Sequence, residues 1–320
     1  MKSINFLFVV LFTVILQSCQ NTGSSFRVGF IVHTLADERW AIERDVFTKR
    51  INELGGSVLF ENANQDERVQ YHQAEQMIES GVDVLVVVPV NSKTSASIAR
   101  LCKKKRVKLI SYDIMIDNSE PDLFISFDNI KIGELMASYA IEKQPTGNYI
   151  LLWGDGGMNV AQWVKEGQMN VLNKYIEDKK INIVYKAFIE NWSSDGAVHL
   201  TDKIFDNTSC CVDAIIASSD GIADGVIQSV KNKKLEKYPL ITGQDASQKA
   251  LQYIRDGMQG MTIYKSFDKM AVIAANSAFE MAKGRKVKAD TVLFNGRVNV
   301  PSILLEPFVV DKNNIDQMVK

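Results

Sequence analysis

The stretch VDVLVVVP, residues 82–89, decides the fold class of this 320-residue chain. Its residues Val84 to Val88 are apolar at every position, so the stretch lacks the alternation of a strand that faces water on one side. Such a run is typical of a parallel strand that helices cover on both faces. The sequence therefore predicts an α/β protein built on parallel sheets.

The same alternation of short apolar runs and amphipathic stretches continues along the chain. A helix is predicted over 37–54, because Trp40, Phe47 and Ile51 fall on one face. A first series of strands is predicted at 27–32, 57–62, 82–89, 107–112 and 123–127. A second series is predicted at 149–153, 183–188, 212–217, 240–242 and 261–264. Two similar α/β halves are the simplest interpretation.

The junction between the halves contains no linker rich in Gly, Pro or Ser. Phe127-Asp128-Asn129 runs directly into a helical stretch, 130–142. A last helix is predicted over 267–283, and residues 291–310 follow it. A terminal segment of this kind could cross back between the halves, so we expect several hinge strands instead of one.

The composition excludes nucleic acid as a partner and points to no cofactor. The 37 basic and 38 acidic residues leave a formal net charge of -1, without the basic excess that attracts phosphate backbones. The three histidines, His33, His72 and His199, stand in no metal-ligand spacing. Residues 154–157, GDGG, are similar to part of a dinucleotide-binding loop, but Asn159 replaces its third glycine, so we predict a turn. We expect neither a metal nor a cofactor.

The first 19 residues, MKSINFLFVVLFTVILQSC, are typical of a secretory signal. Their apolar stretch is too short to span a bilayer comfortably. Because Ser18-Cys19 resembles a bacterial lipobox, we predict a lipoprotein signal peptide over 1–18, lipidation of Cys19 and a flexible tether over 19–25. The protein would then be periplasmic or extracytoplasmic and lipid-anchored to a bacterial membrane. The alternative is a plain signal peptide with an incidental cysteine.

Polar residues stand at the carboxyl ends of the predicted strands, where open parallel sheets bind ligands. They are His33, Thr34, Asp113, Asp128, Ser219, Asp220, Gln244 and Asp245. If the two edges face each other, these side chains line one cleft. Helix capping is the alternative role for Asp128 and Asp220, each directly before a predicted helix. Ser247 is placed to cap the helix after Asp245, which would leave the Asp245 carboxylate free.

Residue types suited to sugar recognition occur near the same strand ends. Sugars are bound by charged and amide side chains that hydrogen-bond to hydroxyls, and by aromatic faces that lie against C–H patches. Arg39, Trp40, Trp192 and Lys265 provide these types. Trp40 could equally fill the core, since it shares a helix face with Phe47. Trp192 lies in a polar loop, ENWSS, where ligand contact is the favoured interpretation.

Seven stretches together resemble one family. They are ERW at 38–40, GVDVLV at 81–86, SYD at 111–113, ISFDN at 125–129, GQDA at 243–246, MTIYK at 261–265 and VPS at 300–302. In this order and spacing they resemble the D-xylose-binding periplasmic proteins of bacterial ABC importers, which are type I sugar-binding proteins. The resemblance implies two Rossmann-like lobes with parallel sheets, joined by three hinge crossovers, that close on a monosaccharide. The N-terminal lobe would comprise 26–128 with 266–297, and the C-terminal lobe 129–265 with 298–320.

The resemblance also implies the binding residues. The principal ligand-binding residues would be Arg39, Asp113, Trp192, Asp245 and Lys265. Weaker candidates are His33, Trp40, Asn159, Ser219, Asp220 and Gln244. Four polar positions of the xylose binders hold apolar or shorter side chains here, namely Ile114, Met158, Val160 and Ser219. Because each lost hydrogen bond weakens binding, the resemblance implies a retained cleft whose ligand is not simply xylose.

The function implied by the resemblance is that of a lipid-anchored solute-binding protein. It would capture a sugar or related polyol and deliver it to an ABC permease, or present it to a membrane sensor kinase. An enzyme that acts on a sugar, with Asp113 and Asp245 as acid and base, is the alternative from another class, although no nucleophile motif supports it. We predict no catalytic residue. A structural lipoprotein and a repressor effector domain are further alternatives, and the secretory start argues against the repressor.

Overall fold

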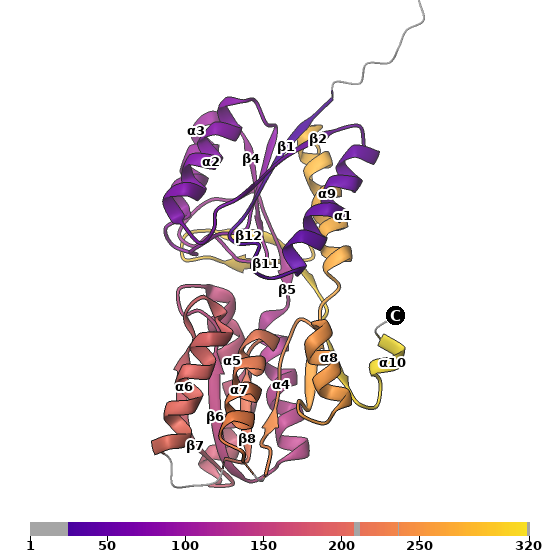
Figure 1. The fold of residues 1–320 in the computed structure, drawn as a ribbon. Coiled ribbons are helices and arrows are strands. Elements are labelled where there is room, and N and C mark those ends of the chain that lie inside the picture. Colours follow the sequence, from indigo (N-terminus) through magenta and orange to yellow (C-terminus); the bar gives the residue numbers. More distant parts are fainter. Residues whose placement is uncertain (1–24, 208–211, 236, 319–320) are drawn as a thin grey trace, which may run out of the picture.

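The computed structural model describes residues 25–207, 212–235 and 237–318, which form two α/β lobes, one above the other in Figure 1. The predicted signal peptide, Cys19 and the pair Cys210-Cys211 lie outside these residues. Within the described part of the chain, no helix has both the length and the apolar character that a membrane span requires.

The N-terminal lobe contains a seven-stranded sheet in the order β11-β12-β5-β4-β3-β1-β2. Its strands are β1 (Arg27–Val32), β2 (Ser57–Asn62), β3 (Val84–Val87), β4 (Lys108–Tyr112), β5 (Leu123–Phe127), β11 (Thr291–Phe294) and β12 (Asn299–Leu305). Every residue of β3 is buried between its neighbours β1 and β4. The helices α2 (Glu67–Glu79) and α3 (Ala96–Lys105) cover one face, and α1 (Arg39–Glu53) and α9 (Phe267–Ala282) cover the other (Figure 1). The predicted parallel sheet between helices is confirmed.

The C-terminal lobe repeats this architecture on a smaller scale. It contains a parallel sheet in the order β7-β6-β8-β9 and an antiparallel pair, β10-β13. Its strands are β6 (Gly147–Trp153), β7 (Ile181–Phe188), β8 (Ala214–Ala217), β9 (Leu240–Ile241), β10 (Met261–Tyr264) and β13 (Phe308–Asp311). Its helices are α4 (Asn129–Lys143), α5 (Asn159–Glu177), α6 (Ser194–Asn207), α7 (Asp220–Asn232), α8 (Gln248–Arg255) and α10 (Ile315–Met318), with a 3₁₀ turn at Glu190–Trp192. Helix α4 packs on α5, and α6 packs on α7.

One aspartate in each lobe plays the same structural role. Asp83 precedes β3, and its carboxylate accepts a hydrogen bond from the Arg27 N–H at the start of β1, at 2.8 Å. Asp213 precedes β8, and its carboxylate accepts a hydrogen bond from the Asn148 N–H in β6, at 2.9 Å. Each aspartate therefore joins the beginnings of two parallel neighbouring strands. This equivalence agrees with the prediction of two similar halves.

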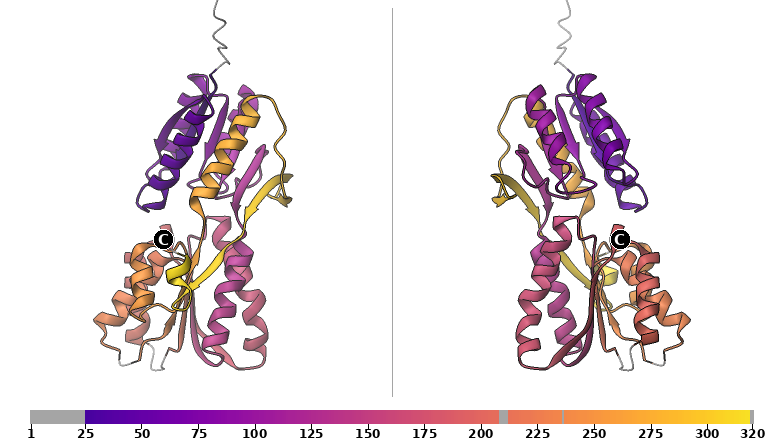
Figure 2. Two further views of the ribbon diagram at one scale, coloured as in Figure 1. Left: turned by 90° about the vertical axis from the view of Figure 1, so that its right-hand side faces the viewer. Right: turned by 90° about the vertical axis from the view of Figure 1, so that its left-hand side faces the viewer.

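The chain crosses between the lobes three times, at 127–129, 264–267 and 305–308. Both views in Figure 2 show the last crossover as the yellow chain that runs from the upper lobe to the lower one. The three predicted hinge crossovers are confirmed, but the assignment of 298–320 to the C-terminal lobe is wrong for β12. Strand β12 pairs in parallel with β5 in the N-terminal sheet, with Ser302 opposite Phe124. It covers an edge of β5 that would otherwise expose unpaired backbone groups.

Candidate ligand-binding site

The lobe interface brings together four charged side chains, Arg39, Asp113, Asp245 and Lys265, which form the charged cluster. The Arg39 Nη2 atom lies 3.0 Å from Asp113 Oδ1, and its Nη1 atom lies 3.6 Å from Asp245 Oδ1. The Lys265 Nζ atom lies 2.7 Å from the same Oδ1 atom of Asp245. Arg39 and Asp113 belong to the N-terminal lobe and Asp245 to the C-terminal lobe, so the Arg39–Asp245 pair joins the two lobes.

Aromatic rings and a further acid surround the guanidinium of Arg39. Its Cζ atom lies 4.0 Å from the ring centroid of Trp40 and 4.3 Å from that of Phe267, distances at which a cation and an aromatic ring attract each other. Its Nε atom donates to Glu43 Oε1 at 3.0 Å. Trp40 is buried in the core, as its alternative interpretation predicted, and His33 packs edge-on against its ring. The core position of Trp40 thus positions Arg39.

Three residues of the predicted site have a left-handed backbone. The angle φ is 61° at Asp113, 54° at Trp192 and 103° at Asp245. Residues other than glycine adopt such angles rarely, at a cost of about 1–3 kcal/mol each. Backbone hydrogen bonds hold two of them in place: the Asp113 N–H donates to Ile125 O, and the Asp245 N–H donates to Ile263 O, both at 2.8 Å. Strain of this kind concentrates at ligand-binding sites.

A buried hydrogen-bond network supports the loop that carries Asp245. The carboxylate of Asp220 accepts hydrogen bonds from Thr262 Oγ1 at 2.8 Å, from Gln259 Nε2 at 3.0 Å and from the Ser247 N–H at 2.8 Å. Burial raises the pKa of Asp220 to about 7. With both oxygens of its carboxylate occupied, Asp220 holds the loop on either side of Asp245.

Helix capping follows the prediction at two positions and departs from it at a third. Ser247 caps α8, which leaves Asp245 free for other contacts. Asp128 caps α4. The predicted capping of α7 by Asp220 is wrong, because Ser219 occupies the capping position and accepts the helix N–H group.

On four residues of the predicted site, a buried polar atom makes no hydrogen bond among the described residues. Arg39 Nη2 and Asp245 Oδ1 are ion-paired, whereas His33 Nδ1 and Gln244 Oε1 have neither kind of partner. The Gln244 amide is held in place because its Nε2 atom donates to Ser218 O at 2.6 Å. Buried polar groups of this kind cost free energy unless a partner is supplied. A molecule rich in hydroxyl groups provides both the donors and the acceptors that these atoms lack.

Trp192 lies at the ends of β6 and β7 in the C-terminal lobe. Its ring covers Gly154 so closely that a Cβ atom at that position would lie 2.1 Å from the ring. Its Nε1 atom lies 3.3 Å from the sulfur of Met158. Trp192 packs against an apolar cluster that contains Ile114, Met158 and Val160, three of the positions for which the resemblance implies polar residues in xylose binders.

Burial and pairing set the protonation states at the interface. Burial alone would raise the pKa of the Asp113 carboxyl, but Arg39 and Lys265 bring it below its ordinary value. Burial lowers the pKa of His33 to about 4, so its imidazole is neutral near pH 7. Among the residues described, no group of three or more His, Cys, Asp and Glu side chains could hold a metal ion.

Asn159 joins the lobes at a second place. Its Nδ2 atom donates to Met115 O at 2.8 Å and to Asp117 Oδ1 at 2.9 Å, and its Oδ1 atom accepts from the Met115 N–H at 3.2 Å. Its own N–H donates to Ser92 Oγ at 3.0 Å. Met115, Asp117 and Ser92 all belong to the N-terminal lobe. The sequence placed Asn159 among the weaker ligand contacts, but its occupied side chain favours a role as a latch between closed lobes.

Replacing Asn159 by Ala is expected to weaken binding of every sugar by the same factor. The change removes three side-chain hydrogen bonds across the interface; at the low end of their net contribution, about 0.5 kcal/mol each because water replaces them when the lobes open, we expect a loss of roughly tenfold. Calorimetric titration with several sugars measures the factor. Gln162→Ala is the matched control, because the Gln162 side chain bonds within the C-terminal lobe, to Gly156 O. A changed order of preference among the sugars would contradict the latch.

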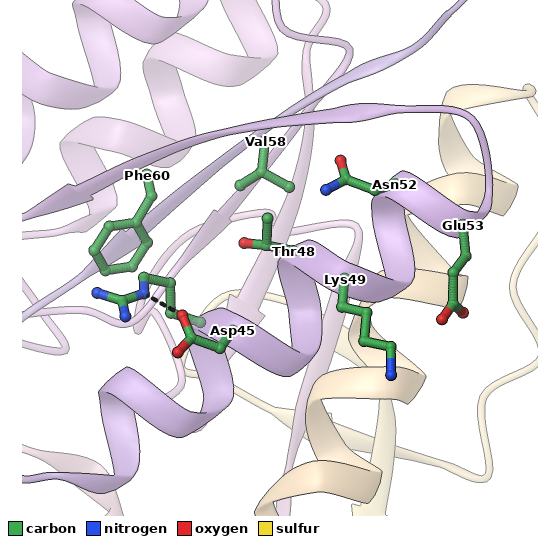
Figure 3. Close-up of a pocket in the computed structure, with 8 residues that line it drawn as sticks. Asp45, Thr48, Lys49, Asn52, Glu53, Val58 and Phe60 are labelled. Carbon is green, nitrogen blue, oxygen red and sulfur yellow. Dashed lines mark hydrogen bonds and ion pairs between the residues drawn. The ribbon is translucent and has the colours of Figure 1, made fainter.

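An open pocket of about 690 Å³ lies elsewhere, between α1 and β2 on the outer side of the N-terminal lobe (Figure 3). It is lined by Arg44, Asp45, Thr48, Lys49, Asn52, Glu53, Val58 and Phe60. The dashed line in Figure 3 ends on Asp45, whose side chain is 69% exposed and forms an ion pair with Arg44. None of the predicted site residues lines this pocket. Its solvated charges do not favour it over the buried cluster as a place to capture a sugar.

Comparison with known proteins decides the family. Residues 28–286 match the model of the periplasmic binding protein domain. The chain is 36% identical over 319 residues to the D-xylose-binding periplasmic protein of Escherichia coli (strain K12), which covers 100% of this chain and 97% of that protein. The chain belongs to the xylose-binding-like family of type I periplasmic sugar-binding proteins.

Other relatives in the periplasmic sugar-binding family agree. The D-xylose-binding periplasmic protein of Haemophilus influenzae is 36% identical, over 93% of this chain and 90% of that protein. The crystal structure of an ABC transporter solute-binding protein from Clostridium phytofermentans with bound β-D-glucose is similar, with a TM-score of 0.88 and 27% identity. The match covers 92% of this chain and 96% of that chain. These relatives are solute-binding proteins and not enzymes, in agreement with the prediction for this chain.

Sequence reasoning missed three residues that surround Arg39, namely Glu43, Tyr112 and Phe267. Glu43 follows Arg39 by four residues, a spacing at which helix side chains meet, so this signal could have identified it. Phe267 reaches Arg39 from α9, and Tyr112 reaches Glu43 from β4. These two contacts join distant parts of the chain, and no local pattern indicates them.

Proposed function

We propose that this protein captures a neutral monosaccharide or related polyol between its two lobes. The observation that carries the proposal is the buried charged cluster, in which ion pairs from both lobes meet beside unpaired polar atoms. Asp113 and Asp245 would accept hydrogen bonds from sugar hydroxyls, and Arg39 and Lys265 would donate them. The ring of Trp192 would lie against the C–H face of the sugar.

The proposed ligand is uncharged and is not simply xylose. Both cations of the charged cluster already have carboxylate partners, so an acidic sugar would bring an unmatched negative charge into a buried site. The apolar side chains of Ile114, Met158 and Val160 lack the hydrogen bonds that polar residues give xylose in its binders. A sugar or polyol that presents an apolar edge to these three side chains would fit the site.

An enzyme with Asp113 and Asp245 as acid and base is less well supported. Arg39 and Lys265 hold the pKa of Asp113 below its ordinary value, so this carboxyl has no proton to give near pH 7. The recognised relatives are solute-binding proteins. Recovery of chemically unchanged sugar after incubation with the protein tests this exclusion.

Delivery to a membrane partner completes the proposal. The relatives support a periplasmic protein of the ABC-importer type, with an ABC permease as the partner and a membrane sensor kinase as the alternative. A lipid on Cys19, outside the described residues, would anchor the chain to a bacterial membrane. Radioactive fatty-acid labelling of the full-length chain tests the anchor, and the neighbouring genes distinguish the two partners.

A thermal-shift screen of pentoses, hexoses, inositols and sugar acids on the body from Phe26 onward tests the proposed function. A sugar at a hundred times its Kd stabilises the folded state by about 2.7 kcal/mol. In a protein of this size we expect this stabilisation to raise Tm by roughly 4 °C. Neutral sugars or polyols should give the largest shifts. A flat response to the whole panel would contradict sugar capture, and a largest shift with a sugar acid would contradict the neutral ligand.

A further inference from the structure

A fully buried carboxylate outside the predicted site contacts Arg39. Glu43 lies one turn after Arg39 on α1, and its side chain is 0% exposed. Its Oε1 atom accepts the hydrogen bond from Arg39 Nε at 3.0 Å, and its Oε2 atom accepts one from the Tyr112 hydroxyl on β4. Because Glu43 is covered by protein, it can influence a ligand only through Arg39.

The contacts of Arg39 engage all three nitrogens of its guanidinium. The Nε atom bonds to Glu43, Nη2 lies 3.0 Å from Asp113 Oδ1, and Nη1 lies 3.6 Å from Asp245 Oδ1. Among these three acids, Glu43 is the one that lies on the same helix as Arg39, and its side chain is fully buried. Without the Glu43 carboxylate, the Arg39 guanidinium would lose the partner of its Nε atom, and its orientation would be set only by Asp113 and Asp245.

The charges around Arg39 are unequal in number. Two cations, Arg39 and Lys265, face four carboxyl groups, which are Asp37, Glu43, Asp113 and Asp245. Burial raises the pKa of Glu43 to about 7, and the attraction of Arg39 offsets this effect only in part. The charged and titratable groups that face Glu43 are Arg39 on its own helix, Tyr112 and Asp113 at the end of β4, and Lys265 before α9. Glu43 therefore changes its charge in the neutral range, while Asp113 stays ionised.

We propose that Glu43 is a positioning residue whose ionised carboxylate fixes Arg39 for sugar binding, so that affinity falls when Glu43 takes up a proton. The proposal rests on the proposed function. An ionised Glu43 accepts a charge-assisted hydrogen bond from Arg39, and a protonated one accepts a weaker bond. Because the ionised form binds sugar better, affinity is highest above pH 7 and decreases as the pH falls through the pKa of Glu43.

Calorimetric titration with D-glucose and with D-xylose, at about pH 8 and about pH 5.5, measures this dependence. For the wild type we expect Kd to increase roughly tenfold on acidification. Glu43→Gln should bind roughly tenfold more weakly at the higher pH and show no further change on acidification. Tyr112→Phe keeps the carboxylate and should keep the pH dependence. His33 titrates below this window and does not contribute.

Asp220 supplies the necessary second control. Burial raises its pKa to about 7 as well, and it supports the loop of Asp245 from the C-terminal lobe. Asp220→Asn is expected to weaken binding at both pH values and to keep the dependence on pH. If Asp220→Asn abolishes the dependence while Glu43→Gln retains it, Glu43 is not its source and the proposal fails. If Glu43→Gln does not fold, loss of the pH dependence in Asp220→Asn still overturns the proposal.

A signal that needs no sugar separates this proposal from the proposed function. The Arg39 Nε–H group, bonded to a buried carboxylate, should give a ¹⁵N–¹H resonance at about pH 8, where rapid exchange with water removes the signal of a free arginine, and its protection relative to free arginine at the same pH should fall on acidification. The resonance should persist in Tyr112→Phe and vanish in Glu43→Gln. A wild type that shows this resonance but binds neither D-glucose nor D-xylose nor any other sugar of the panel would contradict only the proposed function. A resonance unchanged in Glu43→Gln would overturn the positioning role.

Discussion

Replacing Asp245 by Asn is expected to weaken binding of the best sugar by about a hundredfold or more. The Asp245 carboxylate is the point where Arg39 and Lys265 meet, at 3.6 and 2.7 Å. A neutral amide loses the charge-assisted hydrogen bonds to sugar hydroxyls, each contributing about 1.5–3 kcal/mol, and it leaves two buried cations with one partner fewer. Isothermal titration calorimetry measures the loss.

Two controls show whether the loss belongs to the site. Asp45→Asn removes an exposed carboxylate from the outer pocket and should leave the affinity unchanged. Thermal unfolding without sugar should show that Asp245→Asn is folded, since Asp220 and Ser247 still hold its loop. Normal binding by Asp245→Asn, or a loss caused by Asp45→Asn, would mean that the sugar binds elsewhere.

Trp192→Ala should have the second-largest effect, a loss of roughly thirty- to a hundredfold in affinity. The indole is held over Gly154 by a strained backbone, with φ of 53° at Asn191 and 54° at Trp192. The protein maintains this strain to present the ring, so the loss of the ring removes apolar contact worth about 2–3 kcal/mol. Titration calorimetry and the quenching of tryptophan fluorescence by sugar both report it.

Trp192→Phe is the matched variant for this position. Phenylalanine retains an aromatic face, so we expect it to keep affinity within about tenfold of the wild type. Because the Trp192 ring also packs on the apolar cluster beside Gly154, Trp192→Ala is expected to reduce the free energy of unfolding by about 1–3 kcal/mol and Trp192→Phe by less, so binding is measured below the unfolding range of each variant. Equal affinities for all three proteins would show that the ring does not touch the sugar.

The strands that have a clear local pattern of apolar residues could be predicted from the sequence. The unbroken apolar run in β3 indicates a strand covered on both faces, and β1, β2, β5 and β10 begin and end where predicted. Strand β12 could not be assigned by this reasoning, because its place depends on pairing with the distant β5. The local pattern of apolar residues predicts that a strand exists, but it does not identify the strand with which it pairs.

The charged cluster was also largely predictable, because parallel strands present their carboxyl ends at one edge and each polar residue there is visible in the sequence. That rule identifies Asp113 and Asp245, whereas Arg39 at the start of α1 and Lys265 after the antiparallel strand β10 are identified by the family resemblance. The occupied amide of Asn159 could not be foreseen, since its partners Met115 and Asp117 lie on the other lobe. A polar residue at a strand end looks the same in sequence whether it binds a ligand or the facing lobe.

A crystal structure of the protein grown with the best-binding sugar from the screen tests the central claim most directly. We expect sugar oxygens within hydrogen-bonding distance of Asp113, Asp245 and Arg39, with the Trp192 ring against a C–H face of the sugar. We also expect Asn159 to bridge the lobes without touching the sugar. A sugar found in the outer pocket beside Arg44, or lobes whose charged residues face solvent with nothing between them, would contradict sugar capture by the charged cluster.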